Sequence, residues 1–199
     1  MGNLLTMYSR LEDARKEMET NFWGPCRVMK AVLPGMRARR SGVIVNVSST
    51  AGIRVLPTYS HYSSSKFALE AISEGIAQEV AHLNIRIQLV NPGAFRTNFL
   101  GQNNIQYAPL GEDYKGSISD ETLQRIQNMD GRQAGMPDVA AERIWEVVTG
   151  QGMASGREPC LRLPLGSDCV KAVREKLDRV KKNIDIMEDI AISTDEASQ

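Results

Sequence analysis

The stretch that decides the fold is Gly42-Val-Ile-Val-Asn-Val-Ser-Ser49, an apolar run that ends in two serines. Its β-branched residues favour a strand, and the run is suited to a strand that is buried on both faces of a sheet. A second run of this kind, Ile85 to Val90, ends abruptly at Asn91-Pro-Gly93. Between the two runs, apolar residues at three- and four-residue spacing predict a helix over residues 61–83.

Helices and one long loop are predicted on either side of these two strands. Residues 12–40 carry apolar residues at helical spacing, and Gly24-Pro25 predicts a kink or two abutting helices there. Residues 94–119 form a long polar loop, and long loops inside compact domains are more often functional than accidental. The shorter predicted elements are helices over 120–129 and 138–149 and a strand over 160–163.

The alternation of helices and strands predicts the fold class. The order helix, strand, helix, strand is typical of a parallel sheet that is covered by helices. We therefore predict an α/β fold, a partial Rossmann-like doubly wound parallel sheet with flanking helices, in a single domain over residues 1–199. A final amphipathic helix over 167–190 is expected to place five apolar residues inside: Val170, Val173, Leu177, Val180 and Ile184.

Composition and charge exclude several classes of protein. The 199 residues are 42% hydrophobic and 24% charged, which is close to the average of soluble globular domains. The 24 basic residues are balanced by 24 acidic ones, so a nucleic-acid partner and an anionic membrane surface are not expected. The three cysteines are too few for a disulfide framework and fit a reducing compartment. We expect a cytoplasmic protein without a membrane partner.

Polar side chains gather where the two predicted strands end. In a parallel sheet, ligands bind beyond the carboxyl ends of the strands. Ser48-Ser49 ends the first strand, and Tyr62 follows Ser49 by thirteen residues, near the start of the next helix. Lys66 comes one helical turn after Tyr62, so the two side chains share a helix face. A cation beside a phenol favours the ionised phenol, which makes tyrosine usable in acid–base chemistry.

Four segments together resemble the short-chain dehydrogenase/reductase family. They are Asn21-Phe-Trp-Gly24, Gly42-Val-Ile-Val-Asn-Val-Ser-Ser49, Tyr62-Ser-Ser-Ser-Lys66 and Asn91-Pro-Gly-Ala-Phe-Arg-Thr97. The resemblance is dense over residues 11–100 and fainter over 130–190. It implies an NAD(P)-dependent oxidoreductase that interconverts a ketone and a secondary alcohol by hydride transfer.

The resemblance also implies roles for four catalytic residues. Tyr62 would be the general acid or base, and Lys66 would lower the pKa of its phenol and hold the ribose hydroxyls of the cofactor. Ser49 would orient the substrate oxygen, and the spacing to Tyr62 favours it over Ser48. Asn21 would support a water-mediated proton relay through the lysine.

The cofactor and the substrate follow from the same resemblance. Pro92 and Gly93 would pass under the nicotinamide of NADP or NAD, together with Tyr62 and Lys66, and the family's reductive members favour NADP. Phe95 would pack near the ring, and Thr97 would bind its carboxamide or a phosphate. The loop over 93–135 would shape the pocket for a small carbonyl or alcohol substrate, with side chains from Asn103, Asn104, Tyr107 and Tyr114. No metal site is expected, because His61 and His82 lie far apart and no acidic or cysteine cluster accompanies them.

The sequence departs from the family pattern at its start. It contains neither the glycine-rich turn T-G-x-x-x-G-x-G nor N-N-A-G, so about 80–90 residues of a usual enzyme of this type are missing. Gly150-Gln-Gly-Met-Ala-Ser-Gly156 is no substitute, because no apolar helix follows it. The chain is either a fragment of a working reductase or a short protein. In the second case it would be a catalytically impaired partner that oligomerises through helices 12–40 and 61–83, the surfaces also expected to join identical subunits.

Overall fold

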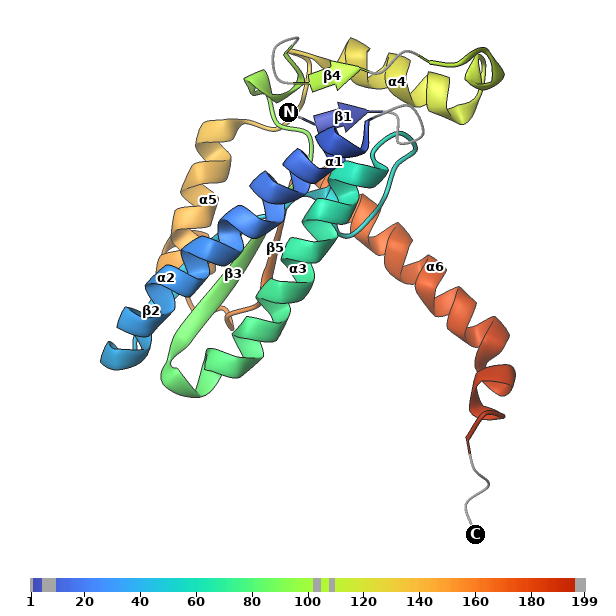
Figure 1. The fold of residues 1–199 in the computed structure, drawn as a ribbon. Helices are drawn as coiled ribbons and strands as arrows, with labels where there is room; N and C mark the ends of the chain where they lie inside the picture. Colours follow the sequence, from blue (N-terminus) through green and yellow to red (C-terminus); the bar gives the residue numbers. More distant parts are fainter. Residues whose placement is uncertain (1, 5–9, 102–104, 108–109, 196–199) are drawn as a thin grey trace.

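The computed structural model describes residues 2–4, 10–101, 105–107 and 110–195 of the chain (Figure 1). Three strands form a parallel sheet in the order β2-β3-β5: β2 is Gly42–Val47, β3 is Ile85–Pro92 and β5 is Arg162–Leu165. The register runs from Gly42 opposite Ile85 to Val47 opposite Val90, so the carboxyl ends of β2 and β3 meet at one edge. The predicted parallel α/β arrangement is therefore confirmed, with the last strand displaced by two residues.

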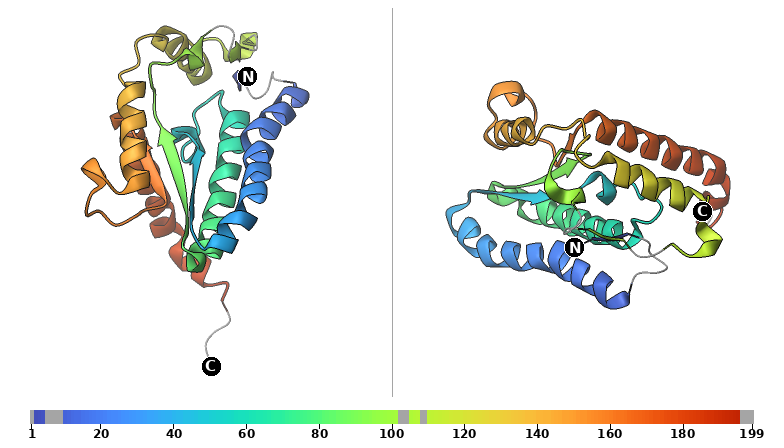
Figure 2. Two further views of the ribbon diagram at one scale, coloured as in Figure 1. Left: turned by 90° about the vertical axis from the view of Figure 1, so that its left-hand side faces the viewer. Right: turned by 90° about the horizontal axis from the view of Figure 1, so that it is seen from above.

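Helices lie on both sides of the sheet (Figure 2). One face carries α1 (Leu11–Met18), α2 (Gly24–Arg39) and α3 (Ser60–Val80), and the other carries α5 (Pro137–Thr149) and the start of α6 (Ser167–Ile192). Beyond the carboxyl edge lie α4 (Ile118–Met129) and a two-stranded parallel ribbon of β1 (Gly2–Leu4) and β4 (Ile105–Tyr107).

The main apolar core lies between the sheet and the first helix layer. Its fully buried members come from α2, β2, α3 and β3, and they are Met29, Ile44, Val80, Ile85 and Ile87. β3 is buried along nearly its whole length, as predicted. β2 differs from the prediction, because Val45 and Val47 are exposed. In the described chain β2 pairs only with β3, and no described helix covers the β2 face that carries these two valines, so β2 is buried on one face alone.

The predicted break near Gly24-Pro25 is a π-helical turn, Glu19–Trp23, that joins α1 to α2. Gly24 donates its N–H to the carbonyl of Glu19, five residues back. Proline has no N–H and its ring crowds the carbonyl four residues before it. An α-helical bond from Pro25 to Asn21 therefore cannot form, which accounts for the wider turn at this point.

The last helix contradicts the burial that was predicted for it. Only Cys169 and Ala172 of α6 are fully buried, whereas Leu177, Val180 and Ile184 are exposed. The physical reason is that α6 runs past the sheet and leaves the body of the molecule (Figure 1). Apolar spacing correctly predicts an amphipathic helix, but it does not say whether another element covers the apolar face.

The long loop after β3 contains more structure than predicted. Short 3₁₀ turns lie at 98–100 and 112–114, and Phe95 bridges to Gly135. Asn103 and Asn104 lie outside the described residues, and only the backbone of Tyr107 is described. The glycines at 150–156 form a helix end and a 3₁₀ turn, as expected of a loop.

Candidate active site

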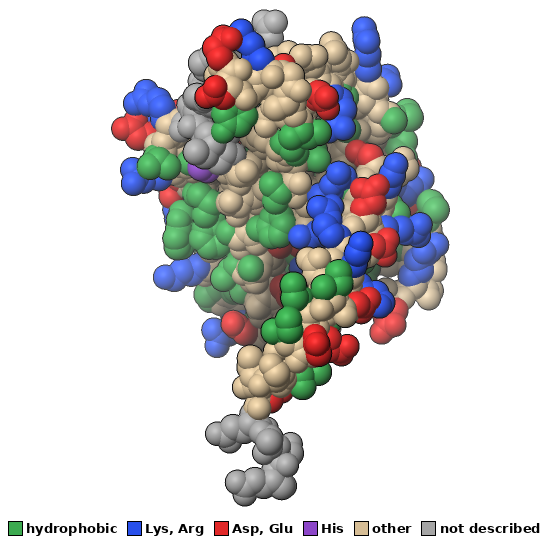
Figure 3. Space-filling model, turned by 90° about the vertical axis from the view of Figure 1, so that its right-hand side faces the viewer, with side chains coloured by type: hydrophobic (Ala, Val, Ile, Leu, Met, Phe, Trp, Pro, Cys, Tyr) green, Lys and Arg blue, Asp and Glu red, His purple; other side chains and the backbone are tan. Residues whose placement is uncertain are grey.

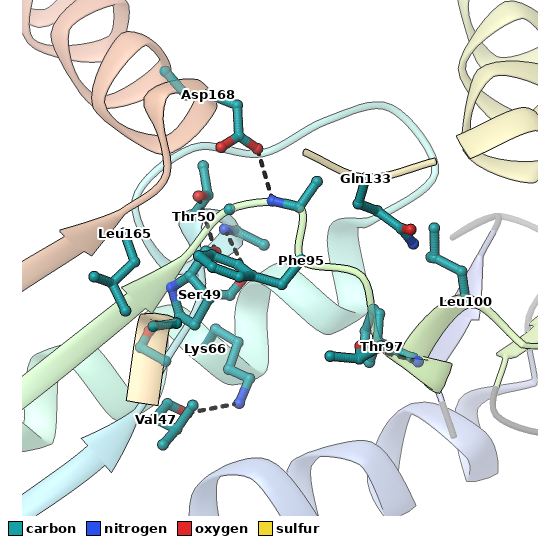
Figure 4. Close-up of a pocket in the computed structure, with 18 of the residues that line it drawn as sticks. Val47, Ser49, Thr50, Lys66, Phe95, Thr97, Leu100, Gln133, Leu165 and Asp168 are labelled. Carbon is teal, nitrogen blue, oxygen red and sulfur yellow. Dashed lines mark hydrogen bonds between the residues drawn. The ribbon is translucent and has the colours of Figure 1, made fainter. Parts of the chain in front are cut away.

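A cavity of about 760 Å³ opens at the carboxyl edge of β2 and β3 (Figure 4). Its walls come from the ends of the two strands, the first turn of α3, the loop after β3 and the start of α6. Seven of the eight predicted site residues line this cavity, and they are Ser49, Tyr62, Lys66, Pro92, Gly93, Phe95 and Thr97.

Ser49 is held at the tip of β2 by two hydrogen bonds, one to its side chain and one to its backbone carbonyl. Its Oγ accepts from the Ala51 N–H at 3.1 Å and thereby caps a short 3₁₀ turn. Its carbonyl accepts from Asn91 Nδ2 at 3.3 Å, which ties the end of β2 to the end of β3. A hydrogen bond links the side chains of Ser49 and Tyr62. Ser48 is buried and its Oγ has no partner, so Ser49 is the serine that faces the phenol.

Tyr62 lies in the first turn of α3 between two other aromatic rings. Its centroid is 5.9 Å from that of Phe99 and 6.1 Å from that of Tyr59. Burial raises the pKa of Tyr62, the Ser49 hydrogen bond opposes this, and the charge of Glu17 raises the pKa further. The expected lowering by Lys66 is not seen, because the apolar surroundings favour the neutral phenol more strongly.

Lys66 lies one turn after Tyr62, and its ammonium points at the tip of β2 (Figure 4). Nζ donates to the carbonyl of Val47 at 3.0 Å and lies 5.8 Å from the centroid of the Tyr62 ring. Burial lowers the pKa of Lys66, and the carboxylates of Glu17 and Glu70 oppose that shift. An ammonium has three donors, so two remain for a ligand in the cavity.

Asn21 is the one predicted site residue that does not line the cavity. It lies in the π-helical turn, where its Nδ2 donates to Ser65 Oγ at 3.1 Å. Ser65 Oγ in turn donates to the carbonyl of Tyr62 at 2.7 Å. The asparagine therefore braces the α3 turn between Tyr62 and Lys66 from behind.

The loop after β3 forms the opposite wall. Thr50 Oγ1 donates to the Pro92 carbonyl at 3.1 Å, and the Gly93 N–H donates to the Leu165 carbonyl at 2.8 Å. A Cβ on Gly93 would lie 2.2–2.5 Å from the carboxyl group of Asp168, so a larger residue would have to displace that side chain. Asp168 itself accepts from the Ala94 N–H at 2.7 Å. Thr97 caps the following 3₁₀ turn through the Phe99 N–H.

Comparison with known proteins shows to which family this chain belongs. The family model of short chain dehydrogenases matches residues 6–108, which include the strand tip, Tyr62, Lys66 and the loop after β3. The chain belongs to the short chain dehydrogenase family.

Relatives of this family member carry several names. It is 44% identical over 108 residues to a 3-ketodihydrosphingosine reductase of Bacteroides thetaiotaomicron, covering 54% of this chain and 40% of that protein. It is 30% identical over 186 residues to an oxidoreductase of Schizosaccharomyces pombe, covering 92% and 60%. The chain thus spans less than two thirds of the length of these curated relatives.

Solved structures agree on the fold. A short-chain dehydrogenase from Streptomyces avermitilis is 33% identical with a TM-score of 0.85, covering 98% of this chain and 68% of that one. ElxO, whose structure contains NADP, is 25% identical with a TM-score of 0.60, covering 86% of this chain and 63% of that one. A Burkholderia phymatum structure with NAD, 17% identical with a TM-score of 0.66 and covering 90% and 63%, shows the same fold.

A buried charged network, which sequence reasoning missed, supports the cavity of this short chain dehydrogenase. Glu70 Oε1 accepts from Asn91 Nδ2 at 2.6 Å, and its Oε2 accepts from Arg162 Nε at 2.8 Å. Arg162 also pairs with Glu74 at 2.5 Å. Through Asn91 the network holds the Ser49 carbonyl. The signal in the sequence was weak, because a glutamate inside a helical pattern is usually on the surface.

Glu17 is a second residue that sequence reasoning missed. It lies in α1 with only 4% of its surface exposed, and neither carboxyl oxygen has a hydrogen-bond partner. Burial raises its pKa to about 7, although the charge of Lys66 opposes the shift. Its carboxyl group is therefore poised to exchange a proton near neutral pH beside Lys66 and Tyr62.

Gln133 is a third. It lines the cavity (Figure 4), is almost fully buried, and has no partner for either atom of its amide. A buried amide without a partner costs free energy, and such groups are commonly kept for a ligand.

Among the described residues no group of histidine, cysteine and acidic side chains could hold a metal ion. No helix within the ranges that the structure describes is long and apolar enough to cross a membrane.

Proposed function

We propose that this family member is the catalytic portion of an NAD(P)-dependent oxidoreductase that interconverts a ketone and a secondary alcohol. The observation that carries the proposal is the convergence of Ser49, Tyr62 and Lys66 on one cavity at the carboxyl ends of β2 and β3. Acid–base catalysis on a carbonyl needs a proton donor and an oxygen-orienting group within reach of one another. The hydrogen bond between Ser49 and Tyr62 supports that reach.

Each side chain has a distinct task in this proposal. Ser49 holds the carbonyl oxygen of the substrate, and the Tyr62 phenol donates its proton to that oxygen. The phenol of Tyr62 is protonated at neutral pH, as a general acid in ketone reduction must be. The unpartnered amide of Gln133 supports a substrate with a hydrogen-bonding group near the far wall of the cavity.

The described residues fit the nicotinamide end of NADP or NAD. Lys66 has free donors for ribose hydroxyls, while Pro92, Gly93, Phe95 and Thr97 form a wall of the same cavity. The bound cofactor supplies the hydride, and neighbours with NADP or NAD support this assignment. No glycine-rich turn for the pyrophosphate occurs in this sequence. The residues named in this paragraph therefore bind the nicotinamide end alone.

The Tyr62→Phe variant tests the proposal. The phenyl ring preserves the packing against Tyr59 and Phe99 but cannot donate a proton. NADPH-dependent ketone reduction should fall by about a hundredfold or more, because general acid catalysis typically contributes that much. The melting temperature should stay within a few degrees of the wild-type value. Turnover at the wild-type rate would remove Tyr62 from the proposed role.

A second function is favoured by a separate observation. Trp23, Val28 and Val32 are exposed on the π-helical turn and α2, and Phe67 is exposed on α3. These side chains support an interface through helices 12–40 and 61–83, in a homo-oligomer or with a full-length relative. In that case the Trp23→Ala variant should weaken association in sedimentation experiments. This function would be refuted if wild type and variant were both monomeric at all concentrations.

A further inference from the structure

The side-chain amide of Gln133 is enclosed by the protein and lies at the wall of the cavity. Only 2% of the residue is exposed, and among the described residues neither Oε1 nor Nε2 has a hydrogen-bond partner. Because the described chain already encloses this side chain, a group that pairs with the amide must reach it from inside the cavity. Such a group would offset the free energy that two unpaired buried atoms cost.

The backbone that carries Gln133 is fixed against the loop after β3. The Gln133 carbonyl accepts from Arg96 Nε at 3.3 Å and from Arg96 Nη2 at 3.1 Å. Two residues further on, the Gly135 N–H donates to the Ala94 carbonyl at 3.2 Å, and the Gly135 carbonyl accepts from the Arg96 N–H at 2.9 Å. The amide is therefore presented from a held segment, which lowers the entropy cost of binding a ligand.

The amide lies in an apolar part of the cavity. In Figure 4 it points toward Leu100, whereas Lys66 points at the tip of β2. Leu100 packs against the buried pair Leu123 and Ile126 of α4, and Ile126 also lines the cavity. A hydrogen bond formed among such side chains is stronger than one formed in water. The amide is thus placed to recognise a polar group on an otherwise apolar ligand.

The two unpaired atoms of Gln133 restrict the chemistry of that polar group. Nε2 donates hydrogen bonds and Oε1 accepts them, so a group that satisfies both must itself accept and donate. A hydroxyl or a carboxamide does both. A carboxylate only accepts, so it would leave Oε1 unpaired.

The charges around the cavity also favour a neutral group. Arg54 pairs with Glu175 at 3.4 Å, and Asp168 accepts from the Ala94 N–H at 2.7 Å. Arg125 lines the cavity from α4 but is exposed, so water weakens its attraction for an anion. Figure 3 shows basic and acidic side chains mixed over the face that carries α6, whose first turn lines the cavity. Charges of both signs therefore oppose one another on this face.

We propose that Gln133 selects a substrate whose apolar skeleton carries, besides the reacting ketone or alcohol, one further hydroxyl or carboxamide. The inference rests on the proposed function, because the reacting oxygen is taken to lie at Ser49 and Tyr62. The second group pairs with the Gln133 amide, and the skeleton between them lies against the apolar wall. A site built in this way rejects the analogue that lacks the second group, because its buried amide then stays unpaired.

Benzylacetone and its ring-hydroxylated derivatives test this preference through binding. The meta and para derivatives differ from the parent ketone only in one hydroxyl, and NMR titration of the whole chain measures the affinity of each. We expect the better of the two to bind about tenfold more tightly than benzylacetone and to shift the Gln133 side-chain amide. Equal affinities in the wild type, or no saturable binding of any of these ketones, would overturn the inference. Tighter binding of the para-carboxy derivative would overturn it as well, because Arg125 would then be the recognising group.

Two glutamine variants test the residue. Gln133→Leu keeps the approximate size of the side chain and removes its amide, so the hydroxylated ketone should lose its advantage while benzylacetone binds as before. The melting temperature should not fall, because an apolar group replaces an unpaired buried amide; a merely structural glutamine would lower it. Gln127→Leu on the exposed side of α4 is the matched control and should keep the preference. A preference that survives in Gln133→Leu would overturn the inference.

Two measurements separate this inference from its alternatives. Reduced nicotinamide mononucleotide should bind Gln133→Leu as tightly as wild type; weaker binding would show that the amide holds the carboxamide of the cofactor instead, and would overturn the inference. Tyr62→Phe should lose turnover but keep the preference for the hydroxylated ketone. Full turnover of Tyr62→Phe with the preference intact would refute the proposed reaction alone, whereas normal turnover of the wild type without any preference would refute the role of Gln133 alone.

Discussion

α3 and α6 are the longest helices of the described chain, with 21 and 26 residues, and they differ in what they bury. α3 lies along the sheet and buries six residues, four of which are polar: Ser63, Ser65, Leu69, Glu70, Ser73 and Val80. α6 buries only Cys169 and Ala172, although it carries larger apolar residues. Position against the sheet, rather than amphipathic pattern, therefore decides which helix holds the site and which offers a free surface.

The largest effect on stability is expected at the buried charge of α3. Glu70→Ala removes one of the two acceptors of the Asn91 amide and the buried partner of Arg162. Breaking a buried charged network typically destabilises a protein strongly, so the free energy of unfolding should fall by about 4 kcal/mol.

Glu74→Ala is the matched control, because Glu74 pairs with the same arginine but is half exposed. Its loss should cost less than about 1 kcal/mol. Urea unfolding at pH 7 measures both values. Equal losses in the two variants would contradict the role given to Glu70.

Two leucines sharpen the comparison of the helices. Leu69 of α3 is 1% exposed, whereas Leu177 of α6 is 61% exposed. Leu69→Ala leaves a cavity and should destabilise the fold by about 3 kcal/mol. Leu177→Ala should change the stability of the monomer by less than about 0.5 kcal/mol. Denaturant unfolding at concentrations where the chain is monomeric checks the difference, and similar losses would show that α6 is packed against the body.

A smaller change in the free energy of unfolding, which depends on pH, is expected where α1 contacts α3. The pKa of Glu17 is raised to about 7 in the folded protein, above its ordinary value of 4.5. Between these two values the folded state keeps a proton that the unfolded state has lost, so stability falls as the pH rises. Glu17→Gln removes this dependence and should stabilise the protein by about 2 kcal/mol at pH 8, with little effect at pH 4.

Thermal unfolding across this pH range measures the effect. Glu158→Gln serves as the control, because Glu158 is exposed and should leave the wild-type pH dependence unchanged. Parallel stability curves for wild type and the Glu17 variant would contradict the burial of that carboxyl group.

Much of the fold and most of the cavity could be predicted from the sequence. β-branched runs that end in polar residues predicted β2 and β3, and the one-turn spacing of Tyr62 and Lys66 placed both on one helix face. Because parallel strands end at the same edge, Ser49 and the turn at Pro92-Gly93 were expected to lie there together. The proton-relay role expected of Asn21 stays a prediction, because its side chain lies outside the cavity and donates to Ser65 behind α3.

The remainder depends on contacts that no local pattern encodes. The exposure of Val45 and Val47 depends on which elements cover β2, and the exposure of Leu177 depends on where α6 leaves the sheet. Glu17 and Glu70 resemble ordinary surface glutamates in a helical pattern, and only the packing of α1 and α3 buries them. The raised pKa of Tyr62 likewise reflects desolvation, which residue spacing cannot measure.

The most direct test of the central claim uses reduced nicotinamide mononucleotide, the nicotinamide half of the cofactor. This ligand needs no pyrophosphate-binding turn, so the whole chain can be titrated with it by NMR. We expect saturable shifts of the Ser49, Gly93 and Thr97 amides, which are lost in Lys66→Met and kept in Lys171→Met on exposed α6. Shifts that spare the cavity, or that persist in Lys66→Met, would contradict the assignment of this pocket to a nicotinamide.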